Sequence, residues 1–237
     1  MNSLQTIPIP NLIIALIPVV VVLIIMYFWA MRTRKAIYSV TRMVVQLVLV
    51  GYLLAFIFAA DNAWIVMGIL SVMLLAASWI SLGPVINKNR RFYLNSFAAI
   101  VIGGVTTLIL ITQFVLGLDP WFEPQYMVPL AGMIFANSMN SISLAAERLE
   151  AELKHDSSFD TCRYLAFNAA LIPQVNAMFA AGLVSLPGMM TGQILSGVSP
   201  LIAVRYQIMV MCMIFGSAGI SAAFYLFFYQ RGLIRNS

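Results

Sequence analysis

Residues 11–31 read NLIIALIPVVVVLIIMYFWAM, without a charged side chain. A helix needs about 20 mostly apolar residues to cross the hydrocarbon core of a bilayer, so this stretch predicts a transmembrane span. Further apolar stretches follow at 38–60, 64–86, 95–116, 126–144, within 170–197, and at 201–228. We therefore expect an all-α, polytopic transmembrane bundle of about seven spans, organised as a single membrane domain over residues 1–237.

The composition indicates a membrane protein with little chain outside the lipid. Hydrophobic residues make up 62% of the chain and charged residues 9%, and the mean hydropathy is +0.96. A soluble domain cannot expose so much apolar surface, so we expect membrane lipid as the surroundings. The net charge of +5 comes from basic residues in short loops. That pattern sets orientation in a membrane and argues against a nucleic-acid partner.

The basic residues also predict which way the chain crosses the membrane. Nearly all of them follow the first, third, fifth and seventh spans or lie at the adjoining helix ends, and the other side holds only Arg205. Cytoplasmic loops carry an excess of lysine and arginine, so we expect the N-terminus outside and the C-terminus inside. The predicted inner set is Arg32, Arg34, Lys35, Arg42, Lys88, Arg90, Arg91, Arg148, Lys154, Arg163, Arg231 and Arg235.

The region 159–200 is too long for one span and rich in helix-breaking residues. Proline removes a backbone hydrogen bond and clashes with the preceding turn. A broken helix persists at membrane depth only where protein or a water-filled cavity satisfies the freed backbone groups. Residues 185–190 therefore form a loop at a membrane face, a kink that helps packing, or a functional break in the sixth span. The breakers are Pro173, Gly182, Pro187, Gly188, Gly192 and Gly197, and the conformational break is expected at Pro187, Gly188, Met189 and Met190.

Polar residues inside the spans are amides and hydroxyls rather than carboxylates. Ion-coupled carriers usually place aspartate or glutamate in their pathway, so this class is disfavoured. Asn137, Asn140 and Ser141 are spaced i, i+3 and i+4 and share a helix face. These groups either join helices by hydrogen bonds, at about 1 kcal/mol or less each, or line a translocation path. The candidate path residues are Asn137, Asn140, Ser141, Gln174, Asn176 and Gln46.

The seventh predicted span carries residues that could also bind a soft metal. Met209, Cys212 and Met213 are spaced i, i+3 and i+4, and their sulfur atoms suit soft metals such as Cu(I). Methionine is also an ordinary filler of apolar cores. The sequence contains no GxxxxGK[ST] phosphate-binding loop. We expect a protein that is not an enzyme and binds no cofactor itself.

Several stretches together resemble one family. They are RMVVQLVLVGY at 42–52, VPLAGMI at 128–134 followed by Asn137-Ser138-Met139, AALIP at 169–173, GLVSLPGMMTG at 182–192 and YQIMV at 206–210. These stretches resemble the FetB-type permease family, the membrane subunits of a bacterial ABC exporter associated with iron efflux, with plant relatives linked to aluminium tolerance. The resemblance runs from about residue 42 to about residue 226, and the Leu-Pro-Gly-Met-Met run is its most specific part.

The resemblance implies a permease of the bacterial inner membrane that exports a metal ion (iron-like) or a small complex of it. It further implies a homodimer of permeases and a separate cytoplasmic ABC ATPase subunit, which would bind ATP and Mg²⁺. A helix from Glu147 to Arg163, with Arg148 and Lys154, would dock that ATPase. The family usually has a longer segment here, with a Leu-Gly-Ala turn and a basic amphipathic helix, whereas residues 147–168 contain no glycine. The alternatives are a non-transporting scaffold or regulatory subunit and an ATP-independent channel.

Overall fold

The computed structural model describes residues 7–31, 33–58, 62–83, 90–154 and 158–234. Throughout these residues the regular structure is helical. The chain forms two compact units, residues 1–61 and residues 62–237. The expectation of an all-α, polytopic membrane bundle is confirmed, and the expectation of a single domain stays a prediction.

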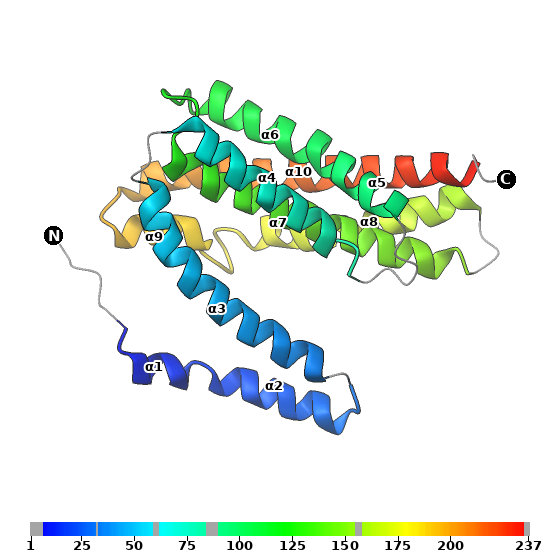
Figure 1. Ribbon diagram of the computed structural model, residues 1–237, viewed down its shortest axis with the longest axis horizontal. Helices are drawn as coiled ribbons and strands as arrows, with labels where there is room; N and C mark the ends of the chain where they lie inside the picture. Colours follow the sequence, from blue (N-terminus) through cyan, green and yellow to red (C-terminus); the bar gives the residue numbers. More distant parts are fainter. Residues whose placement is uncertain (1–6, 32, 59–61, 84–89, 155–157, 235–237) are drawn as a thin grey trace. The chain divides into compact units, whose positions relative to one another are not determined.

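The first unit is a helical hairpin. It consists of α1 (Ile9–Ile14), α2 (Ile17–Phe28) and α3 (Thr33–Phe58), and α2 packs against α3 (Figure 1). Pro18 lies in the first turn of α2, where its missing N–H breaks no helical hydrogen bond. Ala30 adopts a positive φ of 52° in the turn between α2 and α3. The hairpin thus contains the first two predicted spans.

The second unit is built from helices that run in alternating directions along the chain (Figure 1). Its central members are α7 and α10. The helix α7 contacts α4 and α8. The helix α10 contacts α5, α7, α8 and α9. The elements are α4 (Ala63–Ile80), α5 (Arg90–Ile100), η1 (Val101–Val105), α6 (Thr106–Ile109), η2 (Leu110–Val115), α7 (Pro124–Glu152), α8 (Phe159–Ala180), α9 (Gly188–Leu195) and α10 (Pro200–Ile234).

The fourth predicted span is one continuous helix with π-helical turns at η1 and η2. Two glycines in η1 allow it to approach its neighbours closely. A Cβ atom on Gly103 would lie 2.6 Å from the backbone nitrogen of Ser221 on α10. A Cβ atom on Gly104 would lie 3.2 Å from Ile134 and Phe135 on α7. Small residues of this kind let membrane helices pack backbone against backbone.

The sixth predicted span begins earlier than expected. A continuous helix, α8, starts at Phe159 rather than near residue 170 and includes Pro173 in its interior. Its 22 residues extend about 33 Å, which matches the thickness of a bilayer core. The interruption comes only after Ala180, so the break lies toward one end of the segment. Pro173 lies inside this helix, where α7 packs against it, and neighbouring protein is what allows proline within a membrane helix.

The expected single helix from Glu147 to Arg163 is wrong. The helix α7 ends at Glu152, and α8 begins at Phe159 with Ser158 as its N-cap. The Ser158 hydroxyl accepts a hydrogen bond from the backbone N–H of Thr161, which is how serine starts a new helix. Residues 155–157 lie outside the described part of the chain.

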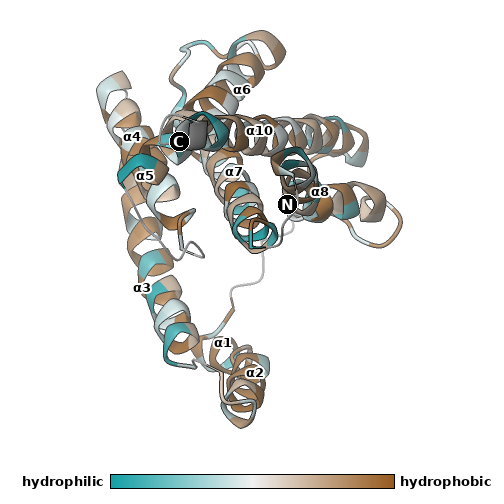
Figure 2. Cartoon of the chain, turned by 90° about the vertical axis from the view of Figure 1, so that its right-hand side faces the viewer, coloured by the Kyte–Doolittle hydropathy of each residue, from teal (hydrophilic) through white to brown (hydrophobic). Residues whose placement is uncertain are grey.

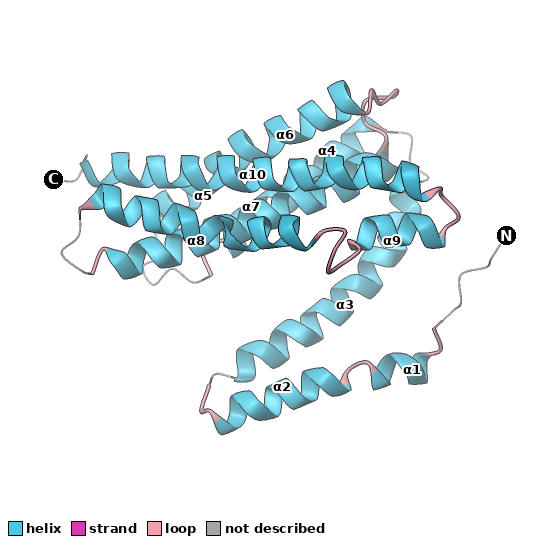
Figure 3. Ribbon diagram, turned by 180° about the vertical axis from the view of Figure 1, so that it is seen from behind, coloured by secondary structure: helices cyan, strands magenta, loops and turns pink. Residues whose placement is uncertain are grey.

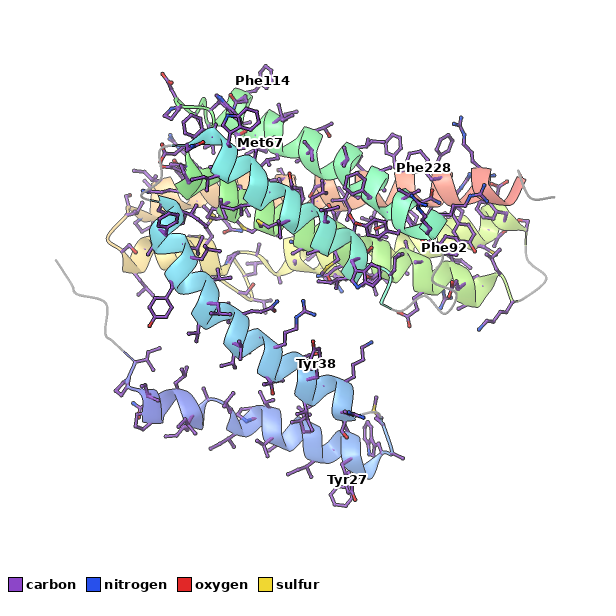
Figure 4. The ribbon with its side chains drawn as sticks, in the orientation of Figure 1. Tyr27, Tyr38, Met67, Phe92, Phe114 and Phe228 are labelled. Carbon is purple, nitrogen blue, oxygen red and sulfur yellow. The ribbon has the colours of Figure 1, made fainter. Side chains whose placement is uncertain are left out.

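Among the described residues, five helical stretches are long and apolar enough to cross a membrane. They are 9–28, 33–58, 63–80, 90–115 and 200–232. The helices α7 and α8, which carry the amide side chains, are outside this set. Phe114 on η2 points away from the bundle and is 83% exposed, as a lipid-facing ring would be (Figure 4). The count of seven spans and the N-out, C-in orientation stay predictions.

Charged residues gather at one end of the second unit. Figure 2 looks onto that end, where the hydrophilic ends of α5, α7 and α8 come together. Arg91 Nη1 donates to the carbonyl oxygen of Gly232 at 3.0 Å, tying the start of α5 to the end of α10. Nearby, the ring of Phe92 stacks on Tyr229 with 5.3 Å between centroids. Basic residues at this end predict that it faces the cytoplasm.

Candidate functional site: a broken helix and its cavities

A helix interrupted by a tight turn is the distinctive feature of the second unit. The helix α8, residues 181–187 and α9 follow one another along α10 (Figure 3). The N–H groups of Leu183, Val184 and Ser185 all donate to the carbonyl oxygen of Ala180, at 3.3, 2.9 and 3.1 Å. Gly182 adopts a φ of 82°, a conformation that costs glycine little. The helix in this region is therefore interrupted, as expected, while its role as a sixth span and as a conformational break stays a prediction.

The second half of the break restarts the helix at Pro187 and Gly188. Pro187 is the N-cap residue of α9, and its carbonyl accepts from the N–H of Thr191 at 3.0 Å. Met189 and Met190 then point to different neighbours. Met190 lines a cavity against α10, and Met189 lines a cavity of about 110 Å³ that also touches α7. A rearrangement of the break would therefore change the contacts of both α7 and α10.

Two predicted path residues come together across α7 and α8. Gln174 Nε2 donates to Asn137 Oδ1 at 3.5 Å, and Asn137 Nδ2 donates to the carbonyl oxygen of Met133 at 2.8 Å. Gln174 is only 6% exposed, and its Oε1 atom has no hydrogen-bond partner among the described residues. Both amides line a cavity of about 140 Å³ between α7, α8 and α10, which we call the amide cavity.

The other candidate path residues lie elsewhere. Ser141 is buried, and its hydroxyl donates to the carbonyl oxygen of Ala170 at 3.0 Å, so it joins α7 to α8. Asn140 and Asn176 are exposed. Gln46 lies on α3, in the other compact unit. Asn137 and Ser141 therefore face the neighbouring helices, whereas Asn140 faces outward. The role of each residue in a translocation path stays a prediction.

A second cavity, of about 310 Å³, lies between the break and α10. Its lining includes the sulfur-containing residues Met178, Met190, Met211 and Cys212, and we call it the sulfur cavity. It shares Met178 and Met211 with the amide cavity. The two cavities therefore adjoin along the α8–α10 interface.

The set Met209, Cys212 and Met213 does not meet at one place. Cys212 lines the sulfur cavity. Met209 lines the cavity on the α7 side, and Met213 is buried at 1% exposure. Spacing of i, i+3 and i+4 spreads side chains over about 100° of helix surface, and here the cavities divide that arc. The sulfur-containing residues that line one cavity come from three helices, which spacing along one helix cannot reveal.

Buried serines form contacts between helices that sequence reasoning did not identify. Ser81 and Ser96 share a hydrogen bond between their hydroxyl oxygens at 2.5 Å, and Ser143 donates to the carbonyl oxygen of Ser81 at 2.8 Å. Ser138 on α7 donates to the carbonyl oxygen of Ser217 on α10 at 3.3 Å. These bonds join α4, α5, α7 and α10. Their only signal in the sequence is small polar residues inside apolar helices.

The residues expected to dock an ATPase lie at the charged end of the unit. Glu147, Arg148 and Lys154 are exposed at the end of α7. Arg148 pairs with Glu152 at 2.6 Å, one turn further along the helix. Exposed pairs of this kind contribute little stability, so these charges remain available to a partner.

Arg163 holds the start of α8 in place at the same end. It pairs with Asp160 at 3.0 Å and donates to Gln230 Oε1 on α10 at 3.2 Å. It also borders an apolar groove of about 530 Å³ between α8 and α10, whose lining includes Phe167 and Phe227. The docking role of these residues stays a prediction.

Comparison with known proteins identifies relatives over most of the chain. The model of an uncharacterised protein family, UPF0014, matches residues 9–159 and 155–234. A UPF0014 membrane protein of Synechocystis is 36% identical over 77% of this chain and 76% of its own length. The probable iron export permease protein FetB of Escherichia coli is 33% identical over 89% and 86%. Protein ALUMINUM SENSITIVE 3 of Arabidopsis thaliana is 31% identical over 88% and 81%. No solved structure matches the chain significantly.

Proposed function

The chain belongs to the UPF0014 family of membrane proteins, and from that premise we propose that it is the permease subunit of an ABC exporter in the bacterial inner membrane. The observation that carries this proposal is the broken α8–α9 segment with the amide and sulfur cavities along its side. Transporters place substrate sites at discontinuous helices, because freed backbone groups and cavities occur together there.

The break supplies a place where the path changes shape. Residues 181–187 separate α8 from α9, which begins at Gly188, and Gly182 supplies the positive φ of the turn. Hinges are a few residues at element ends that absorb large changes in φ and ψ. A small rotation of α9 relative to α8 would open or close the sulfur cavity, since residues of both helices line it. The substrate would then pass along α10 toward the outer side.

The proposed substrate is a metal ion, iron-like, or a small complex of one. Support comes from the name of the Escherichia coli relative, which is a probable iron export permease. The amide cavity offers neutral oxygen atoms from Asn137 and Gln174 rather than carboxylates. Conduction requires sites that bind weakly enough to release the ion, and neutral oxygens meet this requirement.

Energy would come from a separate cytoplasmic ABC ATPase that binds ATP and Mg²⁺. Its docking surface would be the charged end of the second unit, with Glu147, Arg148, Lys154 and Arg163. The positive-inside rule supports a cytoplasmic position for this end. Two copies of the permease would face two copies of the ATPase. Motion of the ATPase would be transmitted to the break through α8, which runs from Phe159 to Ala180 and carries Arg163 in its first turns.

The experiment is co-expression with a candidate ABC ATPase, purification in mild detergent, and measurement of ATP hydrolysis and metal efflux. The double variant Pro187→Ala, Gly188→Ala is expected to insert normally but lose efflux, because the fixed φ of Pro187 and the backbone freedom of Gly188 would both be lost at the start of α9. Gly192→Ala is the matched control, since a Cβ there meets nothing within 4 Å. Normal efflux in the double variant would refute the role of the break.

One observation favours a non-transporting scaffold or regulatory subunit as the second candidate. Only residues 153–158 connect α7 to α8, a connection too short for an additional docking helix. Under this alternative no ABC ATPase forms a stable complex with the chain. Stimulation of ATP hydrolysis by a metal ion would exclude the scaffold, and metal flux without nucleotide would indicate a channel.

A further inference from the structure

The sulfur cavity has a wall that its surroundings do not explain. Met178 comes from α8, Met190 from α9, and Met211 and Cys212 from α10. Methionine is flexible and normally fills irregular gaps in a core. Here three methionines and a cysteine line about 310 Å³ of space that is open at one edge. Filling of a packed core therefore does not account for these residues, because the space beside them stays open.

We propose that the sulfur cavity binds a soft monovalent metal cation, Cu(I), through Met178, Met190, Met211 and Cys212. Thioethers and thiolates are the protein ligands that Cu(I) prefers. Binding would release the Cys212 thiol proton to solvent as the sulfur–metal bond forms. This site depends on the cavity alone and not on transport by the chain.

Charge balance favours a monovalent ion over a divalent one. The sulfur cavity offers one group that can become anionic, the Cys212 thiol, and its other sulfur ligands are neutral. A monovalent cation with one thiolate is neutral overall, whereas a divalent cation would leave a net positive charge in an apolar wall. An uncompensated charge in such surroundings is strongly disfavoured. Within the described residues, no cluster of three or more His, Cys, Asp and Glu could hold a harder ion.

A buried amide is an independent sign that a ligand belongs here. Gln207 lines the same cavity and is 7% exposed. Its Oε1 atom has no hydrogen-bond partner among the described residues. A buried acceptor without a partner costs about 1–3 kcal/mol, and a cation in the cavity would offset this cost.

The cavity is also accessible. Leu186 and Ile208 at its edge are 59% and 60% exposed, and Cys212 itself is exposed. Cys212 can therefore be reached from the open edge of the cavity without separation of the helices.

The test is a titration of the purified full-length chain with Cu(I) under anaerobic conditions, with bicinchoninate as the colorimetric competitor. We expect about one Cu(I) per chain, with sulfur ligands in the X-ray absorption spectrum. Cys212→Ser is expected to weaken binding by roughly 100-fold or more, since even outer-sphere partners contribute about 10–100-fold. Met190→Leu and Met211→Leu keep the side-chain volume and should each weaken binding by roughly tenfold.

Met209→Leu is the matched control. It lies on the same helix as Met211 but lines the other cavity, so its affinity for Cu(I) should equal that of the wild type. No competition with bicinchoninate by the wild-type chain would overturn the proposal. Equal losses in the Met209 and Met211 variants would overturn it as well. Failure of efflux or of ATPase association would leave this binding result unchanged, so the two proposals fail separately.

Discussion

Replacing Gln174 by leucine separates the two roles that a buried amide can have. In the folded chain Gln174 makes a single long hydrogen bond, 3.5 Å to Asn137 Oδ1, and leaves its own Oε1 without a partner among the described residues. A residue retained for stability would be better satisfied than this. We therefore expect Gln174→Leu to impair transport while leaving the fold intact.

The magnitudes follow from these contacts. Hydrogen bonds between membrane helices average about 0.6 kcal/mol, and an unsatisfied buried acceptor costs about 1–3 kcal/mol. Leucine removes both terms but deprives Asn137 Oδ1 of its donor, so the free energy of unfolding should change by no more than about 1 kcal/mol. An amide oxygen facing a charged substrate contributes about 1.5–3 kcal/mol, so its loss should slow efflux by roughly 10- to 100-fold.

The assay pairs unfolding in mixed detergent micelles with metal efflux from cells that express each variant. Asn168→Leu is the matched control, because Asn168 is an exposed amide on the same helix. It should change neither measurement. If Gln174→Leu lowered the free energy of unfolding by well over 1 kcal/mol while efflux stayed normal, the amide would be structural and the reasoning would be wrong.

Two further predictions concern packing and orientation. Gly103→Ala should lower the free energy of unfolding in detergent by about 1–3 kcal/mol, because its Cβ would lie 2.6 Å from the backbone nitrogen of Ser221. Gly216→Ala is the control and should change this free energy little, since a Cβ there meets nothing within 4 Å. Equal stability of the two variants would contradict this packing. A cysteine introduced by Asp119→Cys should react with a membrane-impermeant maleimide in intact cells. A cysteine introduced by Lys154→Cys should react only after the cells are lysed. The reverse labelling would overturn the predicted orientation.

The features predicted correctly from the sequence are those that depend on local patterns. Long apolar runs identify helices by composition alone, and the proline and glycine near residue 187 mark the break through backbone chemistry. The start of α8 was misplaced because Phe159–Asn168 is too polar for a hydropathy argument, although packing against α7 and α10 keeps it helical. The pairing of Gln174 with Asn137 and the sulfur cavity depend on which faces of separate helices meet, and no spacing within one helix contains that information.

The distribution of packing within the second unit connects the break to a mechanism. Where η1 crosses α7 and α10, glycines bring backbones into contact, and Ser138 bonds across the α7–α10 interface. Around the break, by contrast, cavities of about 140, 310 and 110 Å³ adjoin α8, α9 and α10. Closely packed regions move as rigid bodies, and loosely packed regions open at lower free energy. A push applied to α8 at the charged end would therefore change the shape of residues 181–187, next to the cavities, more readily than it would disturb the packing around η1.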